Sequence, residues 1–117
     1  MNVHFDLHDG HDVARLPARL GLADANRIRR SLEEQLDGTR RSLVIDLSEV
    51  DFIDSSGLAA LLAVIKAARR RDGDIVLAAP RARVRALIEL TRLDDFVTIL
   101  PTVSEASARL SARDRAA

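Results

Sequence analysis

The sequence predicts an α/β fold in which helices pack against a mixed β-sheet. Apolar runs of strand length, rich in branched residues, lie at 43–47, 75–79 and 96–100. Each run is followed by a segment whose apolar residues repeat at helical spacing, and the chain starts with a hairpin pattern. The predicted order is β-β-α-β-α-β-α-β-α, an alternation that implies a mixed sheet with helices packed against it.

Length and composition restrict the class of protein. We expect one domain over residues 1–117, long enough to bury a core without disulfides or a metal. The 18 basic residues balance 18 acidic ones, and no aromatic residues interleave with the arginine clusters, so we expect no nucleic-acid partner. The start lacks a leader pattern and no apolar run is as long as a membrane span, so we expect a cytoplasmic protein without a membrane partner.

The first part of the chain predicts a hairpin and then a helix. Residues 3–8 and 12–17 alternate loosely, and Asp9-Gly10 between them is a tight-turn signal. Asp24 is a favoured helix N-cap, and the apolar residues after it repeat every four positions until Gly38, as Ile28, Leu32 and Leu36. Two strands followed by a helix are therefore expected here.

The later part predicts two further strand and helix pairs. The run 75–79 ends at Pro80 and the run 96–100 ends at Pro101. The helix between them is expected to bury Val84, Leu87, Ile88 and one of Leu90 and Thr91. Thr102 and Glu105 have capping-box spacing, which predicts the start of a final helix.

The run 43–47 has the pattern of a central strand covered on both faces, and a longer apolar run after Gly57 predicts a helix. Asp46 is the exception in this strand, and we expect neighbouring loop N–H groups to satisfy its carboxylate. Between the two runs lies Asp54-Ser55-Ser56-Gly57, where Asp54 or Ser55 is expected to cap the helix. The cap alone would explain this junction.

Signatures of enzymes are missing from the sequence. There is no nucleophile elbow, phosphate-binding loop, dinucleotide fingerprint or zinc-binding helix motif, and cysteine is absent. The histidines at 4, 8 and 11 lie far from Ser55 in sequence and have no convincing metal-ligand spacing. We therefore predict no catalytic residues, no cofactor and no metal site.

The functional hypothesis is that Ser55 is a site of phosphorylation. A hydroxyl at the start of a helix faces the positive end of the helix dipole, so a phosphate added there need not unfold the chain. A phosphoserine carries about −1.5 to −2 charges, and beside Asp51 and Asp54 it would create an acidic spot on a surface fitted to a neutral hydroxyl. Such a change would act on a binding partner.

The region from Leu43 to Leu62 resembles the STAS domain, in particular the bacterial anti-sigma factor antagonists. An apolar strand ends in Asp-Leu-Ser, and after a short apolar segment Asp-Ser-Ser-Gly-Leu opens a helix. The resemblance implies that Ser55, directly after the aspartate, is the phosphoacceptor. It also implies a set of motif and partner-binding residues: Asp54, Ser56, Gly57, Leu58, Ala59 and Ala60.

The same resemblance implies the partners. An anti-sigma factor serine kinase with a histidine-kinase-like ATPase fold would bind the unphosphorylated protein and release its sigma factor. Phosphorylation of Ser55 would end that binding, and a PP2C-type phosphatase would restore it. The family often has Gly-x-Leu-Asp after the second strand, whereas this chain has Ala18-Arg19-Leu20-Gly21, so its partner-facing loop is expected to differ.

Two alternatives stay open at this point. The chain could be a non-catalytic STAS scaffold or subunit, of the stressosome type or as partner of a lipid-transport ATPase, with Ser55 only a helix cap. An independent hydrolase that uses Ser55 has little support, because no histidine is placed to act as its base.

Overall fold

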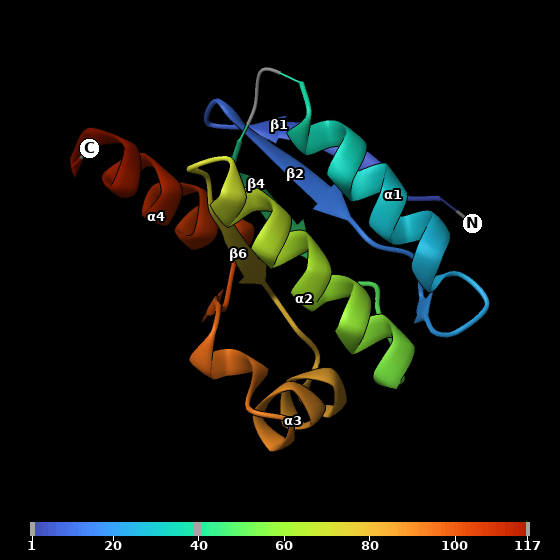
Figure 1. Cartoon of the computed structure of the whole chain (residues 1–117). Helices are drawn as coiled ribbons and strands as arrows, with labels where there is room; N and C mark the ends of the chain where they lie inside the picture. The colour runs from blue at the N-terminus through green and yellow to red at the C-terminus, as the bar shows by residue number, and fades with distance from the viewer. Residues whose placement is uncertain (1, 39–40, 117) are drawn as a thin grey trace.

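The computed structural model describes residues 2–38 and 41–116, and its centre is a five-stranded sheet in the order β1-β2-β4-β6-β7. The strands are β1 (His4–His8), β2 (His11–Arg15), β4 (Leu43–Asp46), β6 (Ile75–Ala78) and β7 (Thr98–Leu100). β1 is antiparallel to β2, and every other neighbouring pair is parallel. The mixed sheet and the predicted order of its strands and helices are confirmed (Figure 1).

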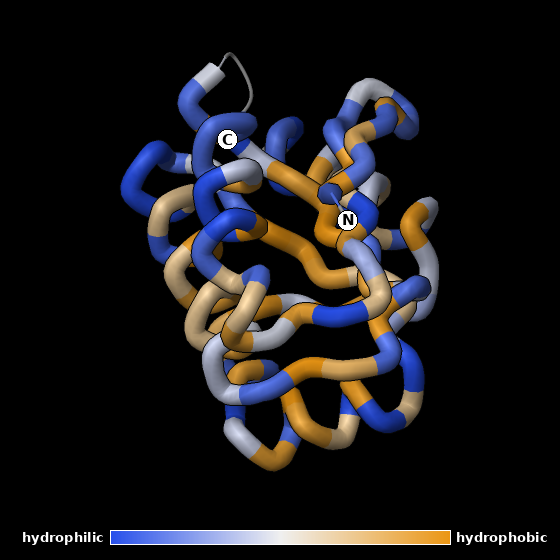
Figure 2. Tube along the Cα trace, turned by 90° about the vertical axis from the view of Figure 1, so that its right-hand side faces the viewer, coloured by the Kyte–Doolittle hydropathy of each residue, from blue (hydrophilic) through white to orange (hydrophobic). Residues whose placement is uncertain are grey.

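Helices cover both faces of this sheet. They are α1 (Ala25–Leu36), α2 (Ser55–Arg70), α3 (Ala82–Leu90) and α4 (Val103–Ala116). One core cluster joins α1, α2 and α3 to Leu43 and Ile45 of β4, and a second joins α4 to Val44. Because alternate strand residues point to opposite faces, a strand covered on both sides is apolar on both, as β6 is throughout and β4 is as far as Ile45. Figure 2 shows hydrophobic stretches running through the middle of the molecule.

The signals for the hairpin turn and for the cap of α4 agree with the structure, whereas Asp24 precedes α1 without a side-chain cap bond. Asp9 and Gly10 both have positive φ, 49° and 81°, as a two-residue hairpin turn of type I′ requires. The backbone N–H of Glu105 donates to Thr102 Oγ1 over 3.1 Å at the start of α4. Asp46 is buried, and its carboxylate accepts the backbone N–H of Ser48 over 2.9 Å, so the structural role expected of it is confirmed.

Some element boundaries differ from the sequence prediction. The strand expected at 96–100 comprises only Thr98–Leu100, because a short 3-10 helix, η1 (Leu93–Asp95), precedes it and leaves Phe96 exposed. Leu90 and Thr91 were candidates for burial in α3, but both are exposed because the helix ends at Leu90. Both differences lie where the chain leaves the C-terminal end of α3.

A second, two-stranded sheet was not predicted. It pairs β3 (Arg19–Leu20) in parallel with β5 (Phe52–Ile53), directly before α2. At this point the backbone of Leu20 lies against Gly57 in the first turn of α2. A Cβ on Gly57 would lie 2.1 Å from the Leu20 carbonyl oxygen and 2.9 Å from Ile53 Cγ1. Glycine is therefore required for the close approach of β3 to α2.

Replacement of Gly57 by alanine should destabilise the fold. The added methyl meets a backbone oxygen, so β3 must move, and overpacking of this kind typically costs about 1–3 kcal/mol. Thermal and urea unfolding measure the loss. Gly38→Ala is the matched control, because its Cβ would lie 3.6 Å from the nearest atom and should change stability by less than about 0.5 kcal/mol. Equal stability of Gly57→Ala and wild type would contradict the close approach.

Candidate functional site

The junction between β5 and α2 is capped by Asp54. Its backbone is extended, with φ −119° and ψ −172°, and its Oδ1 accepts the backbone N–H of Gly57 over 3.0 Å. This confirms Asp54 as the helix cap among the two candidates. The helix begins at Ser55, the second residue of the four-residue junction, so Ser55 occupies the first helical position.

Asp54 also holds a loop that is distant in sequence. Its Oδ2 accepts the backbone N–H of Leu22 over 3.0 Å, while its own N–H donates to the Leu20 carbonyl over 3.4 Å. The N–H of Gly57 lowers the pKa of the Asp54 carboxyl below its ordinary value; desolvation opposes this effect, and the N–H of Leu22 adds to it. One carboxylate thus joins the segment after β3 to the start of α2.

Ser55 is exposed at this helix terminus. Within residues 2–38 and 41–116 its hydroxyl makes no hydrogen bond, because Asp54 rather than Ser55 is the cap. Asp51, also exposed, lies four residues before it. The arrangement leaves a free hydroxyl on a rigid helix end, beside a carboxylate that is already bonded to backbone N–H groups.

The other predicted site residues divide into surface and interior. Ser56 and Ala59 line a groove of about 360 Å³ between α1 and α2, and Leu58 packs partly against the core. Gly57 is buried and Ala60 is only 7% exposed, so these two offer a partner little surface. The space that Gly57 keeps open is occupied by Leu20 of the same chain.

Several exposed apolar side chains beside α2 and its cap were missed by sequence reasoning. Leu22, held beside Asp54, is 77% exposed, and Phe96 is 55% exposed at a second groove along α2. The guanidinium of Arg19 lies over the ring of Phe52, two residues before Asp54, with its Cζ 4.2 Å from the ring centroid. No sequence pattern marks these residues, because their position beside α2 is set by tertiary packing.

The histidines lie on the β1–β2 hairpin. His11 Nδ1 is 3.0 Å from the Ser107 hydroxyl and its Nε2 is 3.3 Å from Asp114, which ties the hairpin to α4. In the part of the chain that the structure describes, no group of three histidine, cysteine or acidic side chains is placed to hold a metal ion. Among the same residues, no helix is both long enough and apolar enough to span a membrane.

The charge of Asp54 should contribute to stability in a pH-dependent way. Because its pKa is lowered in the folded state, the stabilisation is complete above about pH 4 and is lost as the pH falls through the folded-state pKa. Asp54→Asn should therefore melt below wild type at pH 7, with a smaller difference at pH 3. Asp24→Asn is the control, since Asp24 precedes α1 without a side-chain cap bond. An equal difference at both pH values would contradict this role of the charge.

Comparison with known proteins places the chain in a family. The sequence profile of the STAS domain matches residues 3–106. BtrV of Bordetella bronchiseptica, provisionally named an anti-sigma factor antagonist, is 31% identical over 112 residues, which cover 96% of this chain and 94% of that protein. The anti-sigma-B factor antagonist of Listeria monocytogenes is 39% identical over 57 residues, covering 49% of this chain and 50% of that protein.

Solved structures agree with this placement. An anti-sigma factor antagonist from Mycobacterium paratuberculosis has a TM-score of 0.84 at 26% identity, covering 94% of this chain and 93% of that one. The anti-sigma factor antagonist SpoIIAA in its unphosphorylated form has a TM-score of 0.79 at 20% identity, covering 94% and 96%, which shows a shared fold. With the profile match and the similarity to BtrV, these findings show that the chain belongs to the STAS domain family.

Proposed function

We propose that this chain is an anti-sigma factor antagonist that is switched off by phosphorylation of Ser55. Its unphosphorylated form binds an anti-sigma factor serine kinase, of the histidine-kinase-like ATPase fold, and thereby releases a sigma factor. A PP2C-type phosphatase restores the active form. The names of its relatives support the antagonist role. The main support for the switch is the hydroxyl of Ser55, which is exposed and makes no hydrogen bond within the described residues at the first position of α2.

The chain acts as substrate and ligand in this scheme. The Ser55 hydroxyl attacks the γ-phosphorus of ATP held by the kinase, an Oγ–P bond forms, and the bond to the ADP oxygen breaks. The hydroxyl proton passes to a base of the kinase, and ADP leaves. ATP and magnesium enter with the kinase, so this chain needs no cofactor of its own. Hydrolysis by the phosphatase returns the serine and inorganic phosphate.

The fold explains why phosphorylation can change binding without unfolding the protein. The first turn of α2 is fixed by the Asp54 cap and by the contact between Gly57 and Leu20. A phosphate at Ser55 adds about −1.5 to −2 charges at a helix N-terminus, where negative charge is favoured locally. Asp51 and Asp54 lie close in sequence, so the surface becomes strongly acidic and repels a partner fitted to the neutral hydroxyl.

Phosphorylation should occur at Ser55 alone. Incubation with the cognate kinase, ATP and magnesium should add one phosphate, and peptide mass spectrometry should place it at Ser55. Ser55→Ala should abolish the modification because the acceptor oxygen is gone. Ser56→Ala should retain it, since Ser56 is half-buried in the groove between α1 and α2. A phosphate found at Ser56, or retained by Ser55→Ala, would refute this assignment.

A permanent negative charge at Ser55 should weaken the complex. Ser55→Asp should bind the kinase at least tenfold less tightly by calorimetry, because its carboxylate would be buried against a surface fitted to a hydroxyl. Ser55→Ala should bind within about threefold of wild type, since it removes a group without adding charge. If Ser55→Asp bound as tightly as wild type, the electrostatic switch would be wrong, although a phosphate at Ser55 could still be observed.

A further inference from the structure

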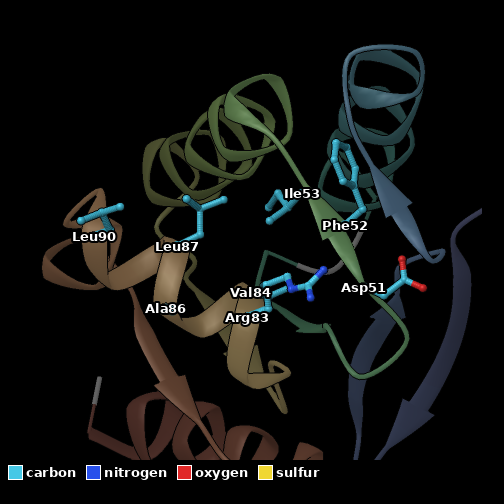
Figure 3. A pocket seen from close by; sticks show the side chains of 8 residues that line it. All are labelled: Asp51, Phe52, Ile53, Arg83, Val84, Ala86, Leu87 and Leu90. Atoms are coloured by element: carbon cyan, nitrogen blue, oxygen red, sulfur yellow. The ribbon is translucent and has the colours of Figure 1, made fainter.

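Another groove lies outside the proposed switch, between β5 and α3, and is distinct from the two along α2. It has a volume of about 450 Å³, within the range of sites that bind ligands or anchor side chains. Figure 3 shows Leu90 at one end and Asp51 at the other, with Leu87 and Arg83 between them. The groove is therefore apolar toward Leu90, and its charged residues lie toward Asp51.

The helix α3 presents two different faces. Val84 and Ile88 are buried in the core and fix the rotation of the helix. Arg83, Leu87 and Leu90 follow one another at spacings of four and three, so they form a separate stripe along the groove. Leu87 is half-buried, whereas Leu90 is 79% exposed. The stripe leaves apolar surface in water that the fold itself does not cover.

The charged residues of the groove also lack partners within the described part of the chain. Arg81 bonds the Ser48 carbonyl, and Arg85 lies 3.5 Å from Glu89. Arg83, between them in sequence, makes no ion pair or hydrogen bond within residues 2–38 and 41–116. The carboxylate of Asp51 makes none within the same residues. Among these residues Arg83 thus stands unpaired at the apolar groove, whereas the Asp51 carboxylate points away from the other lining side chains (Figure 3).

We propose that this groove anchors an amphipathic helix of the anti-sigma factor, an inference that rests on the proposed function. The stripe from Arg83 to Leu90 spans about 10 Å, close to two turns of helix. The docked helix carries apolar side chains over Leu87 and Leu90. It presents an acidic side chain to Arg83, which complements the unpaired guanidinium.

The position of the groove favours the same partner that binds at Ser55. β5 forms one wall, and its last residue, Ile53, is two positions before Ser55. A protein seated over the Ser55 hydroxyl therefore reaches the groove without spanning a separate surface. The groove contributes affinity that does not depend on phosphorylation, whereas Ser55 supplies the switch. Groove residues should accordingly set how tightly the kinase binds, not how fast it transfers phosphate once bound.

The test measures binding and phosphoryl transfer with one kinase, the one that phosphorylates wild-type Ser55. Arg83→Glu and Leu90→Glu should each weaken calorimetric binding at least tenfold and raise the KM for phosphorylation, with kcat within about twofold of wild type. Both positions are exposed, and thermal melts check that the variants fold. Arg85→Glu and Leu7→Glu are the matched controls, another α3 arginine and a leucine 66% exposed on β1, and both should bind like wild type.

The outcomes separate this proposal from the proposed function. If wild type binds and is phosphorylated while Arg83→Glu and Leu90→Glu bind equally well, the groove proposal is overturned and the switch stands. A fall in kcat without a change in KM would also overturn it. If the anti-sigma factor kinase binds neither wild type nor variants, the proposed function itself fails, and the groove proposal fails with it.

Discussion

The close contact between β3 and the first turn of α2 determines the shape of the surface around Ser55. Leu20 approaches Gly57 so closely that no side chain fits between them, and Asp54 bonds both the helix N-terminus and the N–H of Leu22. Because the cap belongs to Asp54, the hydroxyl of Ser55 has no structural task and remains exposed. A single carboxylate thus fixes the helix end and frees the neighbouring serine.

The sheet makes this contact rigid. β4 and β6 are buried on both faces, with α2 packed on one side and α4 on the other. Functional groups on a helix end supported by such a core hold their positions better than groups on a free loop. The exposed surface beside α2 and its cap, by contrast, carries apolar side chains such as Leu22 and Phe96 that the chain does not cover. A rigid site within a partly apolar surface is suited to binding another protein.

Much of the fold could be predicted because its signals are local. The apolar run at 43–47, the turn at Asp9-Gly10 and the cap at Asp54 each depend on neighbouring residues. The pairing of β3 with β5 could not be predicted, since strands of two residues show no periodicity. For the same reason the sequence marked the Ser55 motif but not the buried positions of Gly57 and Ala60, which depend on how β3 and α1 pack on α2.

We propose that the phosphorylation state of Ser55 controls binding on a helix end that is already formed. The most direct test compares the dissociation constants of the anti-sigma factor for the wild-type chain before and after enzymatic phosphorylation, with unfolding temperature recorded for both forms. We expect the phosphorylated form to bind at least tenfold more weakly, with both forms folded. Equal affinity of the two forms, or weaker binding that comes from unfolding of the phosphorylated chain, would contradict it.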